Sequence, residues 1–183
     1  MLSNIRFPRI AGIVAIALAM ALAMIGAATA QAGGGLSTNS PTTVKGSKAK
    51  LVGGKAVAPA GAPEEVQKVI AAANKIRNKP YKWGGGHGSW NDKGYDCSGA
   101  VSFVLHKAGI LDYPLDSGGF MKWGSKRRGK WVSIFASKEH VYMIIAGLRW
   151  DTSYITDGDK SGPGWSEYMR PAKGFRTRHP SGL

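Results

Sequence analysis

The hydrophobic pattern of this chain changes once, from helical spacing to strand-like runs, and this change restricts the folds it can adopt. Residues 63–78 carry apolar side chains at helical spacing and end before Pro80. A second helical stripe covers 97–109. Runs rich in β-branched and aromatic residues follow at 130–135, 140–145 and 148–152. Helices followed by strands predict an α+β domain, with N-terminal helices packed on an antiparallel sheet.

The first 32 residues have the pattern of an export signal. Arg6 and Arg9 precede an almost continuously apolar stretch, and alanines suited to a signal peptidase follow at 28–32. An uncleaved anchor is the alternative, because the apolar run is nearly long enough to span a bilayer. We therefore expect residues 1–32 to be a signal peptide, with no stable membrane span after processing. The protein would then be secreted to the cell wall or periplasm.

Residues 33–62 consist mainly of Gly, Ser, Thr, Ala, Pro and Lys, with few large apolar side chains to bury. We expect a flexible linker there and one domain over 63–183. Without the signal, 23 Lys and Arg stand against 11 Asp and Glu, a net charge of +12. Such charge favours anionic wall polymers as partners, and solubility alone is the alternative explanation. Export and the lack of a recognised motif argue against nucleic acid.

The chain has one cysteine, Cys97, at the predicted start of the second helix. An inert buried thiol, an intermolecular bridge and a reactive thiol are the alternatives for a lone cysteine. Free backbone N–H groups and the helix dipole meet at this position, where they stabilise the nucleophilic thiolate. The same N–H groups can bind the oxyanion of a tetrahedral intermediate. The position therefore favours a nucleophile, with Asp96 as the helix cap.

A nucleophilic thiol needs a base, and the chain has four histidines. His106 lies on the same helix as the cysteine, about 13 Å of rise away and out of phase. His179 is near the C-terminus, and His87 lies in a glycine-rich loop. His140 opens a strand, which holds an imidazole rigidly, as a general base requires. We predict His140 as the base.

Strand pairing selects the group that orients the imidazole. If 146–147 is a two-residue hairpin loop, Tyr142 faces Asp151 on the next strand. Side chains alternate between faces, so His140 and Asp151 then share one face. A loop one residue longer would select Thr152 instead. The remaining alternative is that Asp151 only bonds the turn that follows its strand.

These residues resemble the motifs of the NlpC-type, papain-like cysteine peptidases of bacterial cell walls. The matching strings are Tyr81-Lys82-Trp83-Gly84-Gly85, Asp96-Cys97-Ser98-Gly99-Ala100-Val101, and His140-Val141 at a strand start. The likeness covers about residues 64–152. It implies a papain-like α+β fold and hydrolysis of peptidoglycan stem peptides, usually between D-glutamate and a diamino acid.

The resemblance also implies roles for individual residues. Cys97 corresponds to the nucleophile, His140 to the base, and Tyr81 to a residue that lines the site and helps bind the oxyanion. The predicted oxyanion and substrate-binding set is completed by Ser98, Trp83 and His87. The family commonly has a second histidine where this chain offers Asp151 or Thr152, and the insertion 86–94 is longer than expected.

Two other functions remain open at this point. An amidase that cuts the sugar–peptide link would use the same cysteine and histidine. A non-catalytic, basic wall-binding protein would retain the fold alone. No cofactor is implied, and no metal site is expected, because no group of His, Cys and Asp has ligand spacing.

Overall fold

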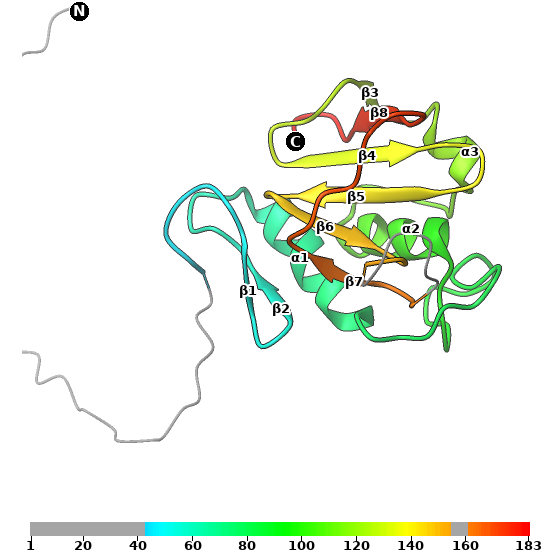
Figure 1. Ribbon diagram of the computed structural model, residues 1–183, viewed down its shortest axis with the longest axis horizontal. Helices are drawn as coiled ribbons and strands as arrows, with labels where there is room; N and C mark the ends of the chain where they lie inside the picture. Colours follow the sequence, from blue (N-terminus) through cyan, green and yellow to red (C-terminus); the bar gives the residue numbers. More distant parts are fainter. Residues whose placement is uncertain (1–42, 155–160) are drawn as a thin grey trace, which may run out of the picture. The chain divides into compact units, whose positions relative to one another are not determined.

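The computed structural model describes residues 43–154 and 161–183. The expected signal peptide, 1–32, and residues 33–42 of the expected linker lie outside the described residues. Figure 1 shows the elements, which follow the chain as β1 (Lys50–Val52), β2 (Lys55–Val57), α1 (Glu64–Ile76), α2 (Cys97–Lys107), α3 (Ser117–Phe120), β3 (Ser125–Lys126), β4 (Val132–Ala136), β5 (Val141–Ile145), β6 (Leu148–Asp151), β7 (Gly164–Ser166) and β8 (Arg176–His179).

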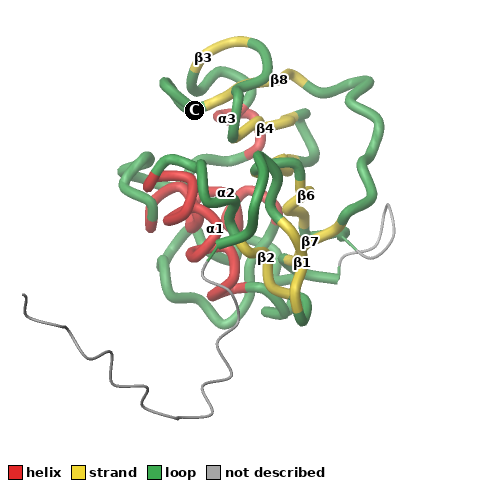
Figure 2. Tube along the Cα trace, turned by 90° about the vertical axis from the view of Figure 1, so that its left-hand side faces the viewer, coloured by secondary structure: helices red, strands yellow, loops and turns green. Residues whose placement is uncertain are grey.

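A six-stranded sheet forms the centre of the domain, in the order β3-β8-β4-β5-β6-β7 with every pair antiparallel. Helices α1 and α2 pack together beside it, on the same side in Figure 2. The predicted α+β class is therefore confirmed. Strands β3, β7 and β8 were not predicted, because segments of two to four residues are too short to show an alternating pattern.

The β5–β6 hairpin has the predicted register. Ile145 pairs with Leu148, so the loop consists of Ala146 and Gly147 alone. Both loop residues have positive φ, 46° and 87°, as a type I′ turn requires. This register brings the end of β6 beside the start of β5, where the predicted base lies.

Helix α1 buries the predicted apolar face, whereas α2 is buried on nearly all sides. Every residue of α2 from Cys97 to Leu105 is buried, although the sequence predicted only a stripe. Strand β5 of the sheet, α1 and α3 all contact the helix. Packing from several directions therefore holds the N-terminus of α2 in one position.

The glycine-rich loop before α2 lies directly against that helix. The Gly85 carbonyl accepts from the Asp96 N–H at 3.3 Å. A Cβ at Gly99 would collide with the same carbonyl oxygen, so only glycine allows this approach. The contact brings the segment that contains Tyr81 and Trp83 to the N-terminal end of α2.

The structure corrects the expected flexible linker for residues 43–62. Strands β1 and β2 form a hairpin whose backbone at Ala56 bonds the Asn74 side chain of α1, at 3.0 Å from N and 2.8 Å from O. The Ala49 N–H donates to the Ala146 carbonyl at 2.8 Å. Small alanines bury well against α1, so this segment needs no large apolar residues to be held in place.

Candidate active site

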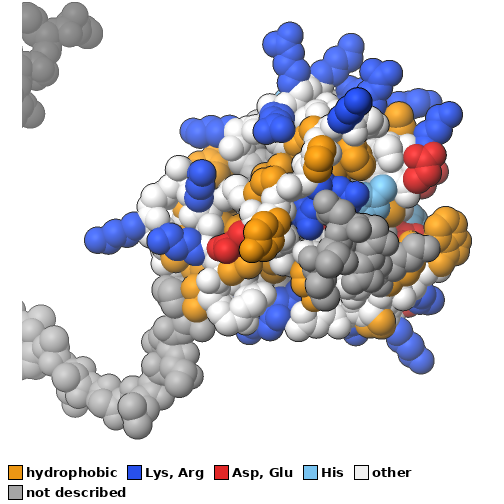
Figure 3. Space-filling model, viewed as in Figure 1, with side chains coloured by type: hydrophobic (Ala, Val, Ile, Leu, Met, Phe, Trp, Pro, Cys, Tyr) orange, Lys and Arg blue, Asp and Glu red, His pale blue; other side chains and the backbone are white. Residues whose placement is uncertain are grey.

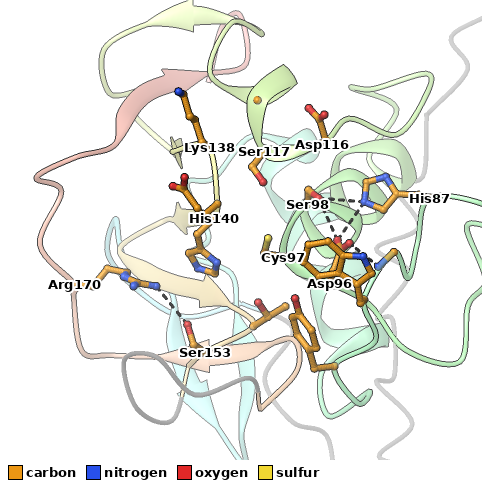
Figure 4. A pocket seen from close by; sticks show the side chains of 16 residues that line it. His87, Asp96, Cys97, Ser98, Asp116, Ser117, Lys138, His140, Ser153 and Arg170 are labelled. Atoms are coloured by element: carbon orange, nitrogen blue, oxygen red, sulfur yellow. Dashed lines mark hydrogen bonds and ion pairs between the residues drawn. The ribbon is translucent and has the colours of Figure 1, made fainter.

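A cavity of about 930 Å³ opens at the N-terminal end of α2. Figure 4 shows that Cys97 and His140 face each other across it. Asp151 lies behind the cavity wall with its side chain fully buried. The other six predicted site residues line the cavity: Tyr81, Trp83, His87, Cys97, Ser98 and His140.

Cys97 is the first residue of α2, as the sequence predicted. The residue is 8% exposed, and it lines the cavity rather than lying wholly within the hydrocarbon core. Asp96 caps the helix, because its Oδ1 accepts from the Gly99 N–H at 2.7 Å. The thiol therefore meets the cavity at the positive end of the helix dipole.

His140 lies in the turn that leads into β5 and is held there by Ser137. The His140 N–H donates to Ser137 Oγ at 3.1 Å, and the Ser137 N–H donates to the His140 carbonyl at 2.8 Å. The imidazole Nε2 lies 2.8 Å from Asp151 Oδ1, and the ring faces the Cys97 side chain in the cavity (Figure 4). The two predicted catalytic partners of His140 thus both lie near its ring.

Asp151 ends β6 and makes bonds through both carboxylate oxygens. Its Oδ1 accepts from His140 and from the Ser153 N–H at 3.2 Å, while Oδ2 accepts from Arg170 Nη1 at 3.0 Å. Burial acts to raise the pKa of Asp151, but the bond and charge of His140, together with the charge of Arg170, lower it overall. Of the two candidates, Asp151 rather than Thr152 is the residue that bonds the imidazole.

The environment of His140 favours its protonated form. Burial acts to lower the pKa of His140, but the hydrogen bond to Asp151 and the interaction with Cys97, followed by the charges of both residues, raise it to about 9. The ring is therefore an imidazolium at neutral pH. A thiolate beside an imidazolium is the charge arrangement of an activated cysteine nucleophile.

We expect activity to decline as the pH rises through about 9, where His140 loses its proton. The pKa of His140 in the folded protein lies above its ordinary value of 6.5, so protonation of this ring also adds to the free energy of unfolding. This contribution is complete below about pH 6.5 and is lost as the pH rises to about 9. NMR titration of the His140 ring measures the midpoint, and Asp151→Asn should move it down. A midpoint near 6.5 in the unaltered protein would contradict this arrangement.

A second histidine–carboxylate pair lies on the opposite wall. His87 Nε2 is 3.1 Å from both Asp96 Oδ1 and Ser98 Oγ. The bond to Asp96 raises the pKa of His87 against the opposing effect of burial. Asp96 Oδ2 accepts from the Gly84 N–H at 3.0 Å, so the pair is joined to the glycine-rich loop. The predicted residues His87 and Ser98 therefore belong to one polar cluster.

The two predicted aromatic residues occupy different parts of the cavity. Burial, followed by the charges of Cys97 and Asp96, raises the pKa of Tyr81, so its hydroxyl remains protonated and able to donate. The Trp83 side chain belongs to the cavity wall although the residue is 84% exposed. The exposed indole at the edge of the cavity provides an apolar surface that a ligand can contact.

Arg170 is a site residue that the sequence did not indicate. It lies in the connection between β7 and β8, lines the cavity and bonds Asp151. The surrounding stretch has no regular hydrophobic period and no motif that would select one arginine.

Among the described residues, no group of three or more His, Cys, Asp or Glu is placed to hold a metal ion. No helix in those residues is both long and apolar enough to cross a membrane.

A scan against protein-family models finds no match to the chain, and a search of the curated proteins finds none either. Solved structures do resemble it. The P60 domain of an antigen from M. avium subspecies paratuberculosis is 27% identical, with a TM-score of 0.48, over 63% of this chain and 94% of that one. The peptidoglycan hydrolase RipB from Mycobacterium tuberculosis is 26% identical, with a TM-score of 0.48, over 64% and 68%. An NlpC/P60 family protein from Bacillus cereus is 22% identical, with a TM-score of 0.40, over 57% and 40%. The chain is thus similar to NlpC/P60 structures, the family whose sequence motifs it also resembles.

Proposed function

We propose that the chain is a secreted NlpC/P60-type cysteine peptidase that hydrolyses peptidoglycan stem peptides, between D-glutamate and a diamino acid. The observation that carries the chemistry is Cys97 at a helix N-terminus on a cavity wall, facing an imidazole that a buried carboxylate bonds (Figure 4). The substrate class follows from the motifs around Cys97 and His140, which resemble those of cell-wall peptidases.

The geometry supports a two-step acyl transfer. The Cys97 thiolate attacks the substrate carbonyl, and the oxyanion is met by N–H groups at the start of α2 and by the Tyr81 hydroxyl. The imidazolium of His140 gives its proton to the departing amine as the C–N bond breaks, which leaves a thioester. The neutral imidazole then takes a proton from water, whose oxygen attacks the thioester and releases the acid and the thiolate.

Incubation with purified peptidoglycan tests the proposal. The protein lacking residues 1–32 should release stem-peptide fragments cut after D-glutamate, identified by mass spectrometry. Glycan strands released together with whole peptides would instead identify an amidase. Binding without release of any fragment would identify a non-catalytic wall protein. The Cys97→Ala variant, purified in the same way, controls for contaminating hydrolases.

We also propose that a basic surface binds anionic wall polymers. We define it as five exposed cationic residues around β3 and β8: Lys126, Arg127, Arg128, Lys130 and Arg176. The β3–β8 pairing and the bond from the Arg127 N–H to the Thr177 carbonyl hold this part of the chain together. Lys and Arg side chains gather at the top of the face in Figure 3, over β3 and β8. No ion pair among the described residues neutralises the five cations.

Charge removal tests this surface. We expect Arg127→Gln, Arg128→Gln and Lys130→Gln together to weaken binding to purified teichoic acid about tenfold or more at low salt, because three exposed charges that attract the polymer are lost. The control variant removes the same charge elsewhere, at exposed Lys55, Lys75 and Lys79. Equal weakening in both variants would show that net charge, rather than this surface, governs binding.

A further inference from the structure

Arg170 reaches from the connection after β7 to the buried carboxylate behind the cavity. Its Nη1 donates to Asp151 Oδ2 at 3.0 Å and to Ser153 Oγ at 3.3 Å. The Asp151 side chain is fully buried, and that of Arg170 is 17% exposed. An ionised carboxylate removed from water is costly unless a cation and hydrogen bonds compensate it. Arg170 supplies the closer of two such cations, since the Nε of buried Arg149 lies 3.9 Å from the same oxygen and Arg170 Nη1 lies 3.0 Å from it.

Two aromatic rings hold the guanidinium in place. Arg170 Cζ lies 5.3 Å from the centroid of the Tyr142 ring and 5.6 Å from that of Phe175. The His140 ring lies 6.4 Å from each of the same two rings. The guanidinium and the imidazole therefore pack against one shared aromatic pair. Movement of either group would disturb the packing of the other.

The two carboxylate oxygens of Asp151 bond different partners. Oδ1 faces His140 Nε2, and Oδ2 bonds Arg170 at 3.0 Å, with the buried Arg149 Nε farther from the same oxygen at 3.9 Å. A carboxylate bonded at both ends cannot rotate about its side chain without breaking a bond to a charged group. Arg170 thereby favours the orientation that points Oδ1 at the imidazole. Its charge also favours the ionised carboxylate, which an imidazolium requires as a partner.

We propose that Arg170 is a positioning residue of the active site, which acts through Asp151 to keep His140 oriented and protonated. The expected effect of Arg170 on turnover rests on the proposed function, whereas its effect on the ionisation of Asp151 does not. The connection between β7 and β8 then has a defined task, since it carries the cation that donates a hydrogen bond to Asp151 at the end of the relay from Cys97 through His140. The relay is thus built from four separate parts of the chain.

Arg170→Gln tests the proposal, because glutamine removes the charge but keeps a hydrogen-bond donor. We expect kcat to fall about 10- to 100-fold while KM changes less than about threefold, since an orienting group acts on the chemical step. Arg170→Lys should recover part of kcat by restoring the charge without the planar fork. Lys173→Gln, in the same connection, serves as the control and should leave kcat unchanged.

Two further measurements separate a positioning role from other roles. In the Asp151→Asn background, Arg170→Gln should cost little additional kcat, because the two residues act as one unit. Carboxyl-carbon NMR should show that Asp151 takes up its proton at higher pH in Arg170→Gln, and the low-pH limb of activity should shift the same way. Additive losses with a raised KM would overturn the proposal in favour of a direct substrate contact. A lowered melting temperature with unchanged kcat would overturn it in favour of a purely structural role.

The NMR titration needs no substrate, so it distinguishes the two proposals. If the unaltered protein does not cut peptidoglycan but the Asp151 titration still moves in Arg170→Gln, the proposed function fails and the coupling of Arg170 to Asp151 stands. If peptidoglycan is cut and neither the titration nor kcat responds to the substitution, the proposed function stands and the role of Arg170 fails.

Discussion

Replacing Cys97 with alanine should reduce the release of stem-peptide fragments by on the order of 10⁴-fold or more, because the reaction loses the atom that forms the acyl intermediate. No other thiol exists in the chain to substitute for it. The assay is fragment release from purified peptidoglycan, measured by mass spectrometry. The remaining rate would come from the oxyanion-binding groups and substrate positioning alone.

The alanine variant should still fold and bind, which separates chemistry from structure. Cys97 is 8% exposed, and its replacement by alanine removes only the sulfur atom, so few core contacts are lost. We expect a melting temperature within a few degrees of the unaltered protein and unchanged sedimentation with peptidoglycan. A folded Cys97→Ala protein that still releases fragments at the original rate would exclude the thiol as the nucleophile.

Replacing His140 with alanine should reduce turnover by a similar factor, about 10⁴-fold, because the thiolate loses its imidazolium partner and the leaving amine loses its proton donor. Alkylation of Cys97 by iodoacetamide near neutral pH should slow in parallel, which reports on the thiolate without any substrate. His179→Ala is the matched control, since that ring bonds the Arg127 carbonyl and lies away from the cavity.

The histidine on the opposite wall provides the decisive comparison. His87 bonds Asp96 and Ser98, whereas His140 bonds Asp151 and faces Cys97 (Figure 4). His87→Ala should therefore leave the rate of Cys97 alkylation near its original value. If His87→Ala slowed alkylation more than His140→Ala did, the base would be His87 and the proposed relay would be wrong.

Local patterns were sufficient for the features that depend on neighbours in the sequence. The start of α2 at Cys97 follows from the preceding glycine loop and from the capping side chain of Asp96. The pairing of β5 with β6 follows from a two-residue turn, and turn length determines register. The choice of Asp151 over Thr152 as the bonding partner of His140 depended on that register alone.

Local patterns failed where distant contacts supply the stability. Residues 43–62 have few large apolar side chains, and their hairpin is held by Asn74 of α1 and the carbonyl of Ala146. The burial of α2 results from neighbours in three other elements, α1, α3 and β5. The periodicity of one sequence contains no information on these partners. It therefore predicted a linker for residues 43–62 and a buried face of α2 that is narrower than the observed one.

The sequence by itself determined the fold class, the position of Cys97 at a helix start and the strand register that brings His140 to Asp151, because each depends on residues close together in the chain. Only the tertiary structure decided that His140 and Cys97 line one cavity, that His87 joins Asp96 and Ser98, and that Arg170 bonds Asp151. These contacts join segments far apart in the chain, and their geometry arises only when the sheet and helices pack around one core.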